Sequence, residues 1–447
     1  MGTHMILIIG AGDVGSNIAL DLAADYDVTV IDRDADRIDD LTTRLDVSGI
    51  VGDGRSVSTL REAGIERAEI VVASTDSDAA NVMVCNAAKR AGDPHTIARV
   101  KDIGLYRTWQ SLDGRLNVDT MLCIDVLAAE AVVQTVALSG AEGVETFADG
   151  RVEVAEFVID DDMPVAGQRI AETDHYPSAT FVALLRGDDI LTPEGDTVIR
   201  AGDRLIVIGS LHGVRQFAED ITPRPSLDAD SNIVIVGDDV VGYQIAHQFE
   251  ARGWTPQVVE RDPDQAVGLT TQLRGVSSRN ADATDPGRFE PDVLTNADLV
   301  VGAVDDDTNY LLAQLASEQA VAKTAAVVND PTVVDLFEET GLDVVVHPED
   351  IIAGKILQVI YGSRPENIGI FEHDNAEVLE VVIDEESELT GKTLKTAASE
   401  LPTGVVIGAI IRNGQLQTPR ESRIVQTGDR IIAFVNAEVA SEAAELL

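Results

Sequence analysis

Three glycines at a fixed spacing mark a candidate binding site near the start of the chain. Gly10, Gly12 and Gly15 form a G-x-G-x-x-G pattern, and Asp32 follows at the spacing of the acidic residue in such motifs. In a dinucleotide-binding turn the first glycine permits a tight turn, the second lets the backbone approach a pyrophosphate, and the third lets a helix pack closely on a strand. The acidic residue accepts hydrogen bonds from ribose hydroxyls and repels a 2′-phosphate. The pattern therefore predicts a nucleotide site that disfavours NADP.

Further polar residues follow the next predicted strands. Asp53 could meet an adenine edge, or it could be a plain turn residue. Residues 74–76 end the fourth strand, beside the crevice where open α/β sheets bind ligands. Arg99 is either a phosphate clamp or an ion-paired arginine. The candidate site comprises Gly10, Gly12, Asp13, Val14, Gly15, Asp32, Arg33, Asp53, Ser74, Thr75, Asp76 and Arg99.

Short strands alternating with helices would hold these residues in place. Residues 6–10, 28–32 and 69–74 are short runs rich in β-branched residues, and stretches with helical spacing of ten or more residues separate them. This alternation is typical of stacked βαβ units. It predicts a Rossmann-like, doubly wound parallel sheet with the glycine turn between its first strand and first helix.

The same layout recurs in the second half of the chain. The segment ILIIGAGDVG at 6–15 corresponds to IVIVGDDVVG at 233–242, and VTVIDRD at 28–34 corresponds to PQVVERD at 256–262. Asn81 aligns with Asn309. Because the glycines of the tight turn and of the helix contact are kept, we expect a second domain of the same fold.

The second half differs from the first at two positions of the candidate site. Asp239 replaces the glycine of close approach, and Val327 stands where the first half has Arg99. A carboxylate close to a pyrophosphate is repelled by it in a partly desolvated pocket. The second site is therefore expected to be silent, or much weaker for anionic nucleotides, unless Asp239 turns towards solvent.

A smaller unit follows each of these domains. Strand-like runs at 155–159, 180–186 and 203–209 surround one short helical stretch near 166–172, which predicts a small α+β domain. A second copy shares its Thr-Pro and Gly-Asp-Arg segments. The apolar helical segment 125–138 either bridges the first two domains or packs on another subunit. The expected boundaries are 5–140, 141–222, a linker at 223–231, 232–366 and 367–447.

The composition limits the classes of partner. Lys and Arg total 33 against 78 Asp and Glu, for a net charge of −45, so the chain repels nucleic acid and anionic membranes. Such an acidic, hydrated surface is typical of a halophile protein in concentrated salt; a surface for one basic partner is the lesser interpretation. Two cysteines exclude a disulfide framework. With no apolar run of about 18 residues and no secretory signal before the first strand, we expect a cytoplasmic protein.

Signatures of catalysis are missing from the sequence. No Cys/His group has metal-ligand spacing, so no metal site is expected, and there is no G-x-S-x-G or Walker A motif. The seven histidines are scattered, and none suggests a proton relay beside the glycine turn. We therefore expect a protein that binds a nucleotide without being an enzyme.

These segments together resemble a known family. The stretches ILIIGAGDVG, VIDRD, VGDG, ASTDSDAANVMVCNAAK and IARVKD resemble the N domain of regulators of potassium conductance (RCK), and ILTPEGDTVIRAGDRLIVIG resembles the RCK C domain. Two N–C pairs in one chain are similar to the layout of the TrkA family, the cytoplasmic subunits of Trk potassium uptake systems. The resemblance covers nearly the whole chain.

The resemblance implies a regulatory function. It implies a homo-oligomeric ring, expected to be a tetramer, beneath a membrane-embedded potassium-translocating subunit, which would keep the protein at the inner face of the membrane. NAD(H), ATP or ADP would bind the Rossmann crevice and gate transport. Family nucleotide contacts match Gly10, Gly12, Gly15, Asp32, Asp53, Thr75 and Arg99. The alternatives are an NAD-dependent oxidoreductase, or a free-standing nucleotide sensor or scaffold with another partner.

Overall fold

The fold is described from a computed structural model. It describes residues 4–447 except 25, 113–115, 139, 149, 174–175, 177, 188, 223–226, 228–229, 238–239, 262–272, 274, 281–292, 340, 363–365, 374–375, 385–386, 388, 437–438, 440–441, 444–445 and 447. Asp239 and most of the expected linker at 223–231 therefore lie outside the described residues.

The chain divides into two compact units, and each draws on both halves of the sequence. One unit combines Met1–Val132 with Asn232–Leu357, and the other combines Val133–Ser231 with Gln358–Leu447. The first unit thus holds both copies of the larger domain. The second holds both copies of the smaller one.

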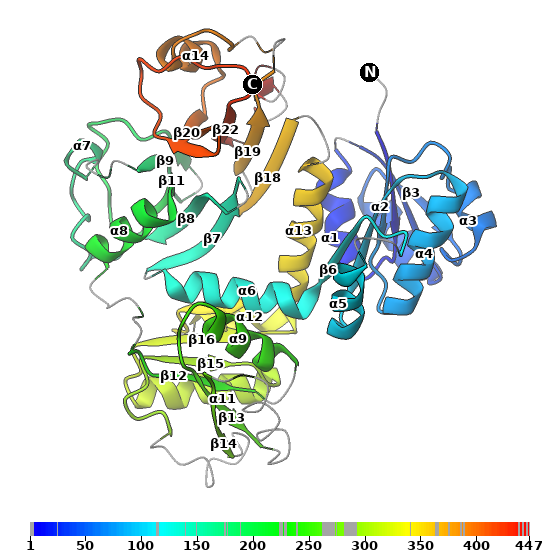
Figure 1. The fold of residues 1–447 in the computed structure, drawn as a ribbon, viewed down its shortest axis with the longest axis horizontal. Helices are drawn as coiled ribbons and strands as arrows, with labels where there is room; N and C mark the ends of the chain where they lie inside the picture. The colour runs from blue at the N-terminus through cyan, green and yellow to red at the C-terminus, as the bar shows by residue number, and fades with distance from the viewer. Residues whose placement is uncertain are drawn as a thin grey trace. The chain divides into compact units, whose positions relative to one another are not determined.

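The first half begins with a parallel sheet in the order β3-β2-β1-β4-β5-β6 (blue and cyan in Figure 1). This is the doubly wound order of a Rossmann fold, and the order reverses between β1 and β4. Strand β1 is buried along its whole length, as its unbroken apolar run predicts for a central strand covered on both faces. The elements are β1 Met5–Ile9, α1 Asp13–Leu22, β2 Asp27–Asp32, α2 Ala35–Arg44, β3 Ser48–Val51, α3 Val57–Glu62, β4 Ile70–Ala73, α4 Asp78–Ala91, β5 His95–Val100, α5 Ile103–Ser111, β6 Thr120–Cys123 and α6 Ile124–Ala137.

The second half repeats this sheet in the order β14-β13-β12-β15-β16-β17. All its strand pairs are parallel, which confirms the fold expected from the repeat. The elements are β12 Ile233–Val236, α9 Val240–Ala251, β13 Gln257–Glu260, β14 Ser277–Asn280, β15 Leu299–Gly302, α11 Asp306–Glu318, β16 Lys323–Val327, η2 Pro331–Val333, α12 Val334–Glu339, β17 Val344–Val346 and α13 Pro348–Gly362.

The smaller domains are antiparallel sheets of matching topology. Their orders are β10-β9-β11-β8-β7 and, read from the other edge, β18-β19-β22-β20-β21. The elements of the first are β7 Ala141–Phe147, β8 Val152–Val158, α7 Ile170–Thr173, β9 Ala179–Arg186, β10 Asp189–Leu191, β11 Arg204–Gly209 and α8 Leu211–Ile221. Those of the second are β18 Glu366–His373, β19 Ala376–Val382, α14 Leu394–Glu400, β20 Val405–Arg412, β21 Gln415–Gln417 and β22 Arg430–Asn436.

The sequence pattern differs from the structure in one helix of the first small domain. It predicts one short helical stretch near 166–172, whereas the structure has α7 over Ile170–Thr173 and a second helix, α8. Ser210 caps α8 through its side chain, and Phe217 lies fully buried on its inner face. The apolar helix expected at 125–138 is α6, which leads from β6 to β7.

The repeated Gly-Asp-Arg segment has a structural role. The carboxylate of Asp203 is buried and accepts hydrogen bonds from Arg186 Nε and from the backbone N–H of Arg200, both at 2.7 Å. Asp429 is held in the same way by Arg412 Nε at 2.7 Å. Because a buried carboxylate needs such partners, these aspartates fix the turn before the last long strand of each small sheet.

Candidate functional site

The glycine turn between β1 and α1 depends on the absence of side chains at two positions. Gly10 has a φ of +112°, and a Cβ there would lie 3.0 Å from the backbone nitrogen of Thr75. At Gly15 a Cβ would lie 1.9 Å from the carbonyl oxygen of Gly10. Gly12 differs, since a Cβ there would meet only Nη1 of Arg37, at 3.5 Å. The first and third glycines therefore shape the turn, while the second leaves space beside the backbone.

A cavity of about 340 Å³ opens at the carboxyl ends of β1, β2 and β4. This is the crevice at which the strand order of the sheet reverses. It is lined by eight of the sequence-predicted residues: Gly10, Gly12, Asp32, Arg33, Asp53, Ser74, Thr75 and Asp76. Asp13, Val14, Gly15 and Arg99 are not among its lining residues.

The carboxylate of Asp32 is fixed by the backbone around it. One oxygen accepts a hydrogen bond from the N–H of Ala11 at 2.7 Å, and the other accepts one from the N–H of Asp34 at 2.8 Å. Asp32 therefore ties the glycine turn to the start of α2. A carboxylate has about four acceptor positions, so each oxygen can still accept a bond from a ribose hydroxyl.

Basic residues surround Asp53 on the rim of the cavity. Arg33 Nη2 lies 2.7 Å from its carboxylate, and Arg55 Nη2 lies 2.8 Å from it. The hydrogen bond with Arg55, supported by Arg33, holds the pKa of Asp53 well below its usual range. Asp53 is therefore an ionised acceptor throughout the neutral range, held between two guanidinium groups.

Two lining arginines are not among the sequence-predicted residues. Arg37 projects from α2 over Gly12, and Arg55 comes from the turn after β3. Each is a single arginine in an exposed segment, without a recognisable motif, so the sequence gives no reason to choose it. Together with Arg33 they give the cavity three arginines, which lie beside three lining aspartates.

A buried asparagine organises the end of β4. The side chain of Asn81 accepts hydrogen bonds from the backbone N–H of Thr75 at 3.0 Å and from its hydroxyl at 2.5 Å. Its amide donates to the carbonyl oxygens of Thr75 and Arg99, both at 2.8 Å. Asn81 therefore joins the ends of β4 and β5, and the repeat that aligns it with Asn309 is the signal that could have identified it.

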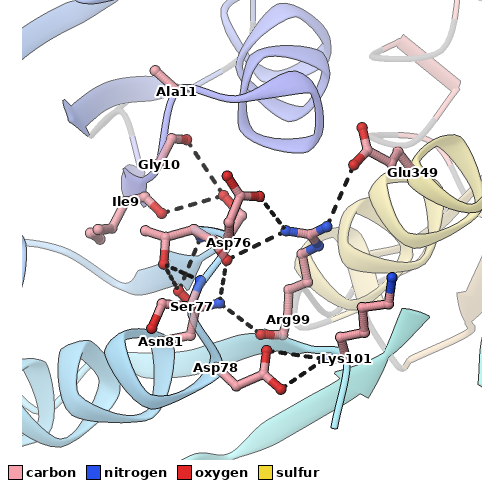
Figure 2. A network of polar contacts seen from close by, with 12 residues as sticks. Ile9, Gly10, Ala11, Asp76, Ser77, Asp78, Asn81, Arg99, Lys101 and Glu349 are labelled. Atoms are coloured by element: carbon pink, nitrogen blue, oxygen red, sulfur yellow. Dashed lines mark hydrogen bonds and ion pairs between the residues drawn. The ribbon is translucent and has the colours of Figure 1, made fainter. Parts of the chain in front are cut away.

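Arg99 lies behind the cavity in a network of carboxylates (Figure 2). Its Nη1 is 3.3 Å from Asp76 and 3.4 Å from the carbonyl oxygen of Thr75, and its Nη2 is 3.5 Å from Glu349. Only 12% of its side chain is exposed. Arg99 is thus ion-paired in this structure, with a partner on the second half of the chain that the sequence reasoning missed.

Two glycines of the second half are closely packed at the positions that correspond to Gly10 and Gly15. A Cβ on Gly237 would lie 2.5 Å from the carbonyl oxygen of Ala303, and one on Gly242 would lie 2.9 Å from that of Gly237. Val327 is buried at the end of β16, and its carbonyl oxygen accepts a hydrogen bond from Asn309 at 2.8 Å. Asn309 therefore joins two strands as Asn81 does, but the second half has no arginine at the position of Arg99. Since Asp239 lies outside the described residues, its effect on ligand binding stays a prediction.

Membrane-spanning helices and metal-binding clusters are both absent from the described part of the chain. Among those residues, none of the helices has the length and apolar character needed to cross a bilayer. Over the same residues, no group of three or more His, Cys, Asp or Glu side chains is arranged to hold a metal ion.

Known protein families match the chain in the order of its repeats. Residues 6–112 and 233–348 match the TrkA-N domain, and residues 154–222 and 378–447 match the TrkA-C domain. A Trk system potassium uptake protein TrkA homolog of Archaeoglobus fulgidus is 30% identical over 96% of this chain and 96% of its own length. TrkA of Halomonas elongata is 27% identical over 96% of this chain and 95% of its own length.

Solved structures share the fold. The GsuK channel bound to NAD superposes with a TM-score of 0.62 at 17% identity, covering 100% of this chain and 79% of that one. The GsuK RCK domain superposes with a TM-score of 0.60 at 18% identity, covering 99% of this chain and 95% of that one. At such identities the similarity concerns the fold.

Proposed function

This chain belongs to the TrkA family of Trk system potassium uptake proteins, as its resemblance to that family predicts, and we propose that it is the nucleotide-sensing regulatory subunit of a membrane potassium transporter. The observation that carries the proposal is the cavity at the carboxyl ends of β1, β2 and β4. Helix α1 begins beside it, and the N-terminus of a helix favours a phosphate through its free N–H groups and partial positive charge.

The ligand is an adenine nucleotide, NAD(H) or ATP/ADP. Asp32 accepts bonds from the ribose hydroxyls, and Gly12 leaves room for the phosphates beside the backbone. Arg33, Arg37 and Arg55 supply positive charge at the cavity. The GsuK channel, which was solved bound to NAD, has the same fold, which supports NAD(H) as one candidate.

Regulation proceeds through an assembly. A homo-oligomeric ring, expected to be a tetramer, lies beneath a Trk-type transporter subunit, and the protein is held at the cytoplasmic face of the membrane by that partner. A ligand shifts the ring between two shapes only by as much as its affinities for them differ. Within each chain of the ring we expect domains at 5–140, 141–222, 232–366 and 367–447, with 223–231 as the linker between the halves.

The role is regulatory rather than catalytic. The residues around the cavity hold carboxylates, guanidinium groups and hydroxyls, and no histidine is among them. An NAD-dependent oxidoreductase would need an acid or base beside the nicotinamide, so turnover of NADH by the purified protein would favour that alternative. Isolation of the protein with a partner other than a potassium transporter would favour a free-standing sensor.

Isothermal titration of nucleotides tests the proposed site. NADH, NAD, ATP and ADP are titrated into the full chain and into Gly12→Asp, in concentrated KCl. We expect one site per chain in the wild type and a loss of affinity of at least about 10-fold in Gly12→Asp, because a carboxylate at that position faces the phosphates. No binding of any of the four ligands by the folded wild type would refute the proposal.

Two variants complete this test. Gly12→Asn adds a side chain of nearly the same size as aspartate but without the charge. It therefore distinguishes charge repulsion of the phosphate from steric obstruction of the ligand. We expect it to weaken binding less than Gly12→Asp. Asp239→Gly restores the missing glycine of the second half, and we expect it to create a second, weaker site. Two sites in the wild type would contradict the predicted silence of the second half.

A further inference from the structure

An acidic residue of the second half contacts the arginine predicted to bind phosphate in the first half. Glu349 lies in the first turn of α13, and its Oε1 is 3.5 Å from Nη2 of Arg99. The other side of the guanidinium faces Asp76, at 3.3 Å (Figure 2). Arg99 is largely buried and Glu349 is 27% exposed, so the pair is partly shielded from solvent. In this structure the two terminal nitrogens of Arg99 each face a carboxylate.

Glu349 also stands close to the start of α1. Burial raises its pKa, and the carboxylate of Asp13, the first residue of α1, raises it further, while Arg99 and His347 oppose the shift. Two carboxylates therefore share the region in front of the helix N-terminus with one arginine. A nucleotide phosphate placed at that helix terminus would meet both of them, and like charges at short range repel strongly in a partly buried site.

We propose that Glu349 competes with the nucleotide phosphate for Arg99, so that binding of the ligand in the first half releases this contact with the second half. The inference rests on the proposed function, because it concerns the same site. A guanidinium forms strong bonds with either a carboxylate or a phosphate, and Nη2 of Arg99, which contacts Glu349, is the donor for which the two would compete. By linkage, a contact that weakens binding is itself weakened when the ligand binds.

A further polar contact joins α13 to the first half. Nδ2 of Asn17 donates a hydrogen bond to Oδ1 of Asp350 at 3.3 Å, and the other oxygen of Asp350 is 2.7 Å from Nδ1 of His347. Figure 1 shows α13 next to α1. Because Asp350 keeps this attachment, removing the charge of Glu349 should leave the helix in place. Glu349→Gln is therefore a suitable variant.

The experiment compares nucleotides of different charge. Adenosine, ADP and ATP are titrated by calorimetry into the full-length wild type, Glu349→Gln and Glu349→Asp in concentrated KCl with EDTA. We expect Glu349→Gln to bind ATP roughly 3- to 10-fold more tightly than the wild type, ADP less so, and adenosine equally. Glu349→Asp keeps the charge and should resemble the wild type. Glu66→Gln, which removes one exposed negative charge elsewhere, controls for net charge.

Hydrogen exchange in the first two turns of α13 provides a second measurement. We expect ATP to speed exchange there in the wild type, and to have no further effect in Glu349→Gln. Unchanged or weaker ATP binding by Glu349→Gln, or slower exchange with ATP, would overturn the inference; weaker binding would mean that Glu349 contributes to the ligand site. If neither the wild type nor Glu349→Gln binds a nucleotide, the proposed function fails as well.

Discussion

At the scale of single residues, the glycine turn combines positions of different kinds. Gly15 has no room for a Cβ because the carbonyl oxygen of Gly10 is 1.9 Å from where it would lie. Gly12 has that room, apart from the end of the Arg37 side chain. The same motif therefore contains one glycine needed for packing and one that leaves space beside the backbone. That this space serves a ligand stays a prediction.

This difference gives a prediction for stability. Gly15→Ala should lower the free energy of unfolding of its domain by about 1–3 kcal/mol, because helix α1 must move away from the turn. Gly12→Ala should leave stability nearly unchanged, since only a flexible arginine end lies near. Thermal unfolding measures both. Equal melting temperatures for Gly15→Ala and the wild type would contradict this prediction, because the turn would then accommodate a Cβ at position 15.

At the scale of elements, polar side chains join the ends of neighbouring strands. Asn81 joins β4 to β5, and Asn309 joins β15 to β16 through the carbonyl oxygens of Val304, at 3.1 Å, and Val327, at 2.8 Å. Both asparagines are buried. A buried amide with all its bonds satisfied fixes geometry more than it binds ligand, which explains why the repeat retains it in the half that lacks Arg99.

The stability contributed by His347, at the start of α13, should depend on pH. The hydrogen bond that His347 Nδ1 donates to the carboxylate of Asp350 raises the pKa of the buried His347, and Glu349 adds to the effect. A raised folded-state pKa means that protonated His347 contributes stability fully below about pH 6.5, its usual pKa, and that this contribution is lost as pH rises through the raised value. The melting temperature should therefore exceed that of His347→Gln by more at pH 6 than at pH 9.

The matched variant for this prediction is Asp350→Asn. It removes the carboxylate that raises the pKa of His347. It also keeps a side-chain oxygen that can accept the hydrogen bond from Asn17. The pH-dependent part of the stability difference should shrink in this variant. A difference between wild type and His347→Gln that does not change with pH would contradict the assignment of a protonated His347.

At the scale of the whole molecule, the two copies of the small domain pack against each other within one chain. The small domains illustrate this, because one apolar cluster contains Val182, Ile206 and Ile208 of the first sheet together with Ile432 and Phe434 of the second. Both sheets belong to the same compact unit. One chain therefore supplies both sides of an interface that would otherwise require two copies.

A glycine in this cluster allows the pairing to be tested. A Cβ on Gly408 of β20 would lie 2.7 Å from Cδ1 of Ile208 and 2.8 Å from its Cβ. Gly408→Ala should therefore lower the melting temperature, at a cost of about 1–3 kcal/mol for overpacking. In a chain that also carries Ile208→Ala, the change Gly408→Ala should cost less, since Cδ1 and Cγ2 of Ile208 are gone and only its Cβ remains close. Additive losses in the double variant would contradict direct contact between the two positions.

Features that depend on local patterns could be predicted from the residues alone. The alternation of strands and helices, the tandem order of the domains, the tight turns at Gly10 and Gly237 and the acidic residue at Asp32 can all be read from spacing and residue type. Each depends on neighbours along the chain or within one strand–helix–strand unit, where hydrophobic period and glycine geometry restrict the backbone to few conformations.

The contacts that join distant segments could not be predicted from the sequence and are seen only in the folded chain. Glu349 meets Arg99 across 250 residues of sequence, and Arg37 reaches the space beside Gly12 from a neighbouring helix. A single charged side chain has no periodicity, and its partner is chosen by the folding of both sheets and the position of α13. The position of the cavity was therefore predictable from the chain, while the carboxylate of Glu349 that contacts Arg99 was not.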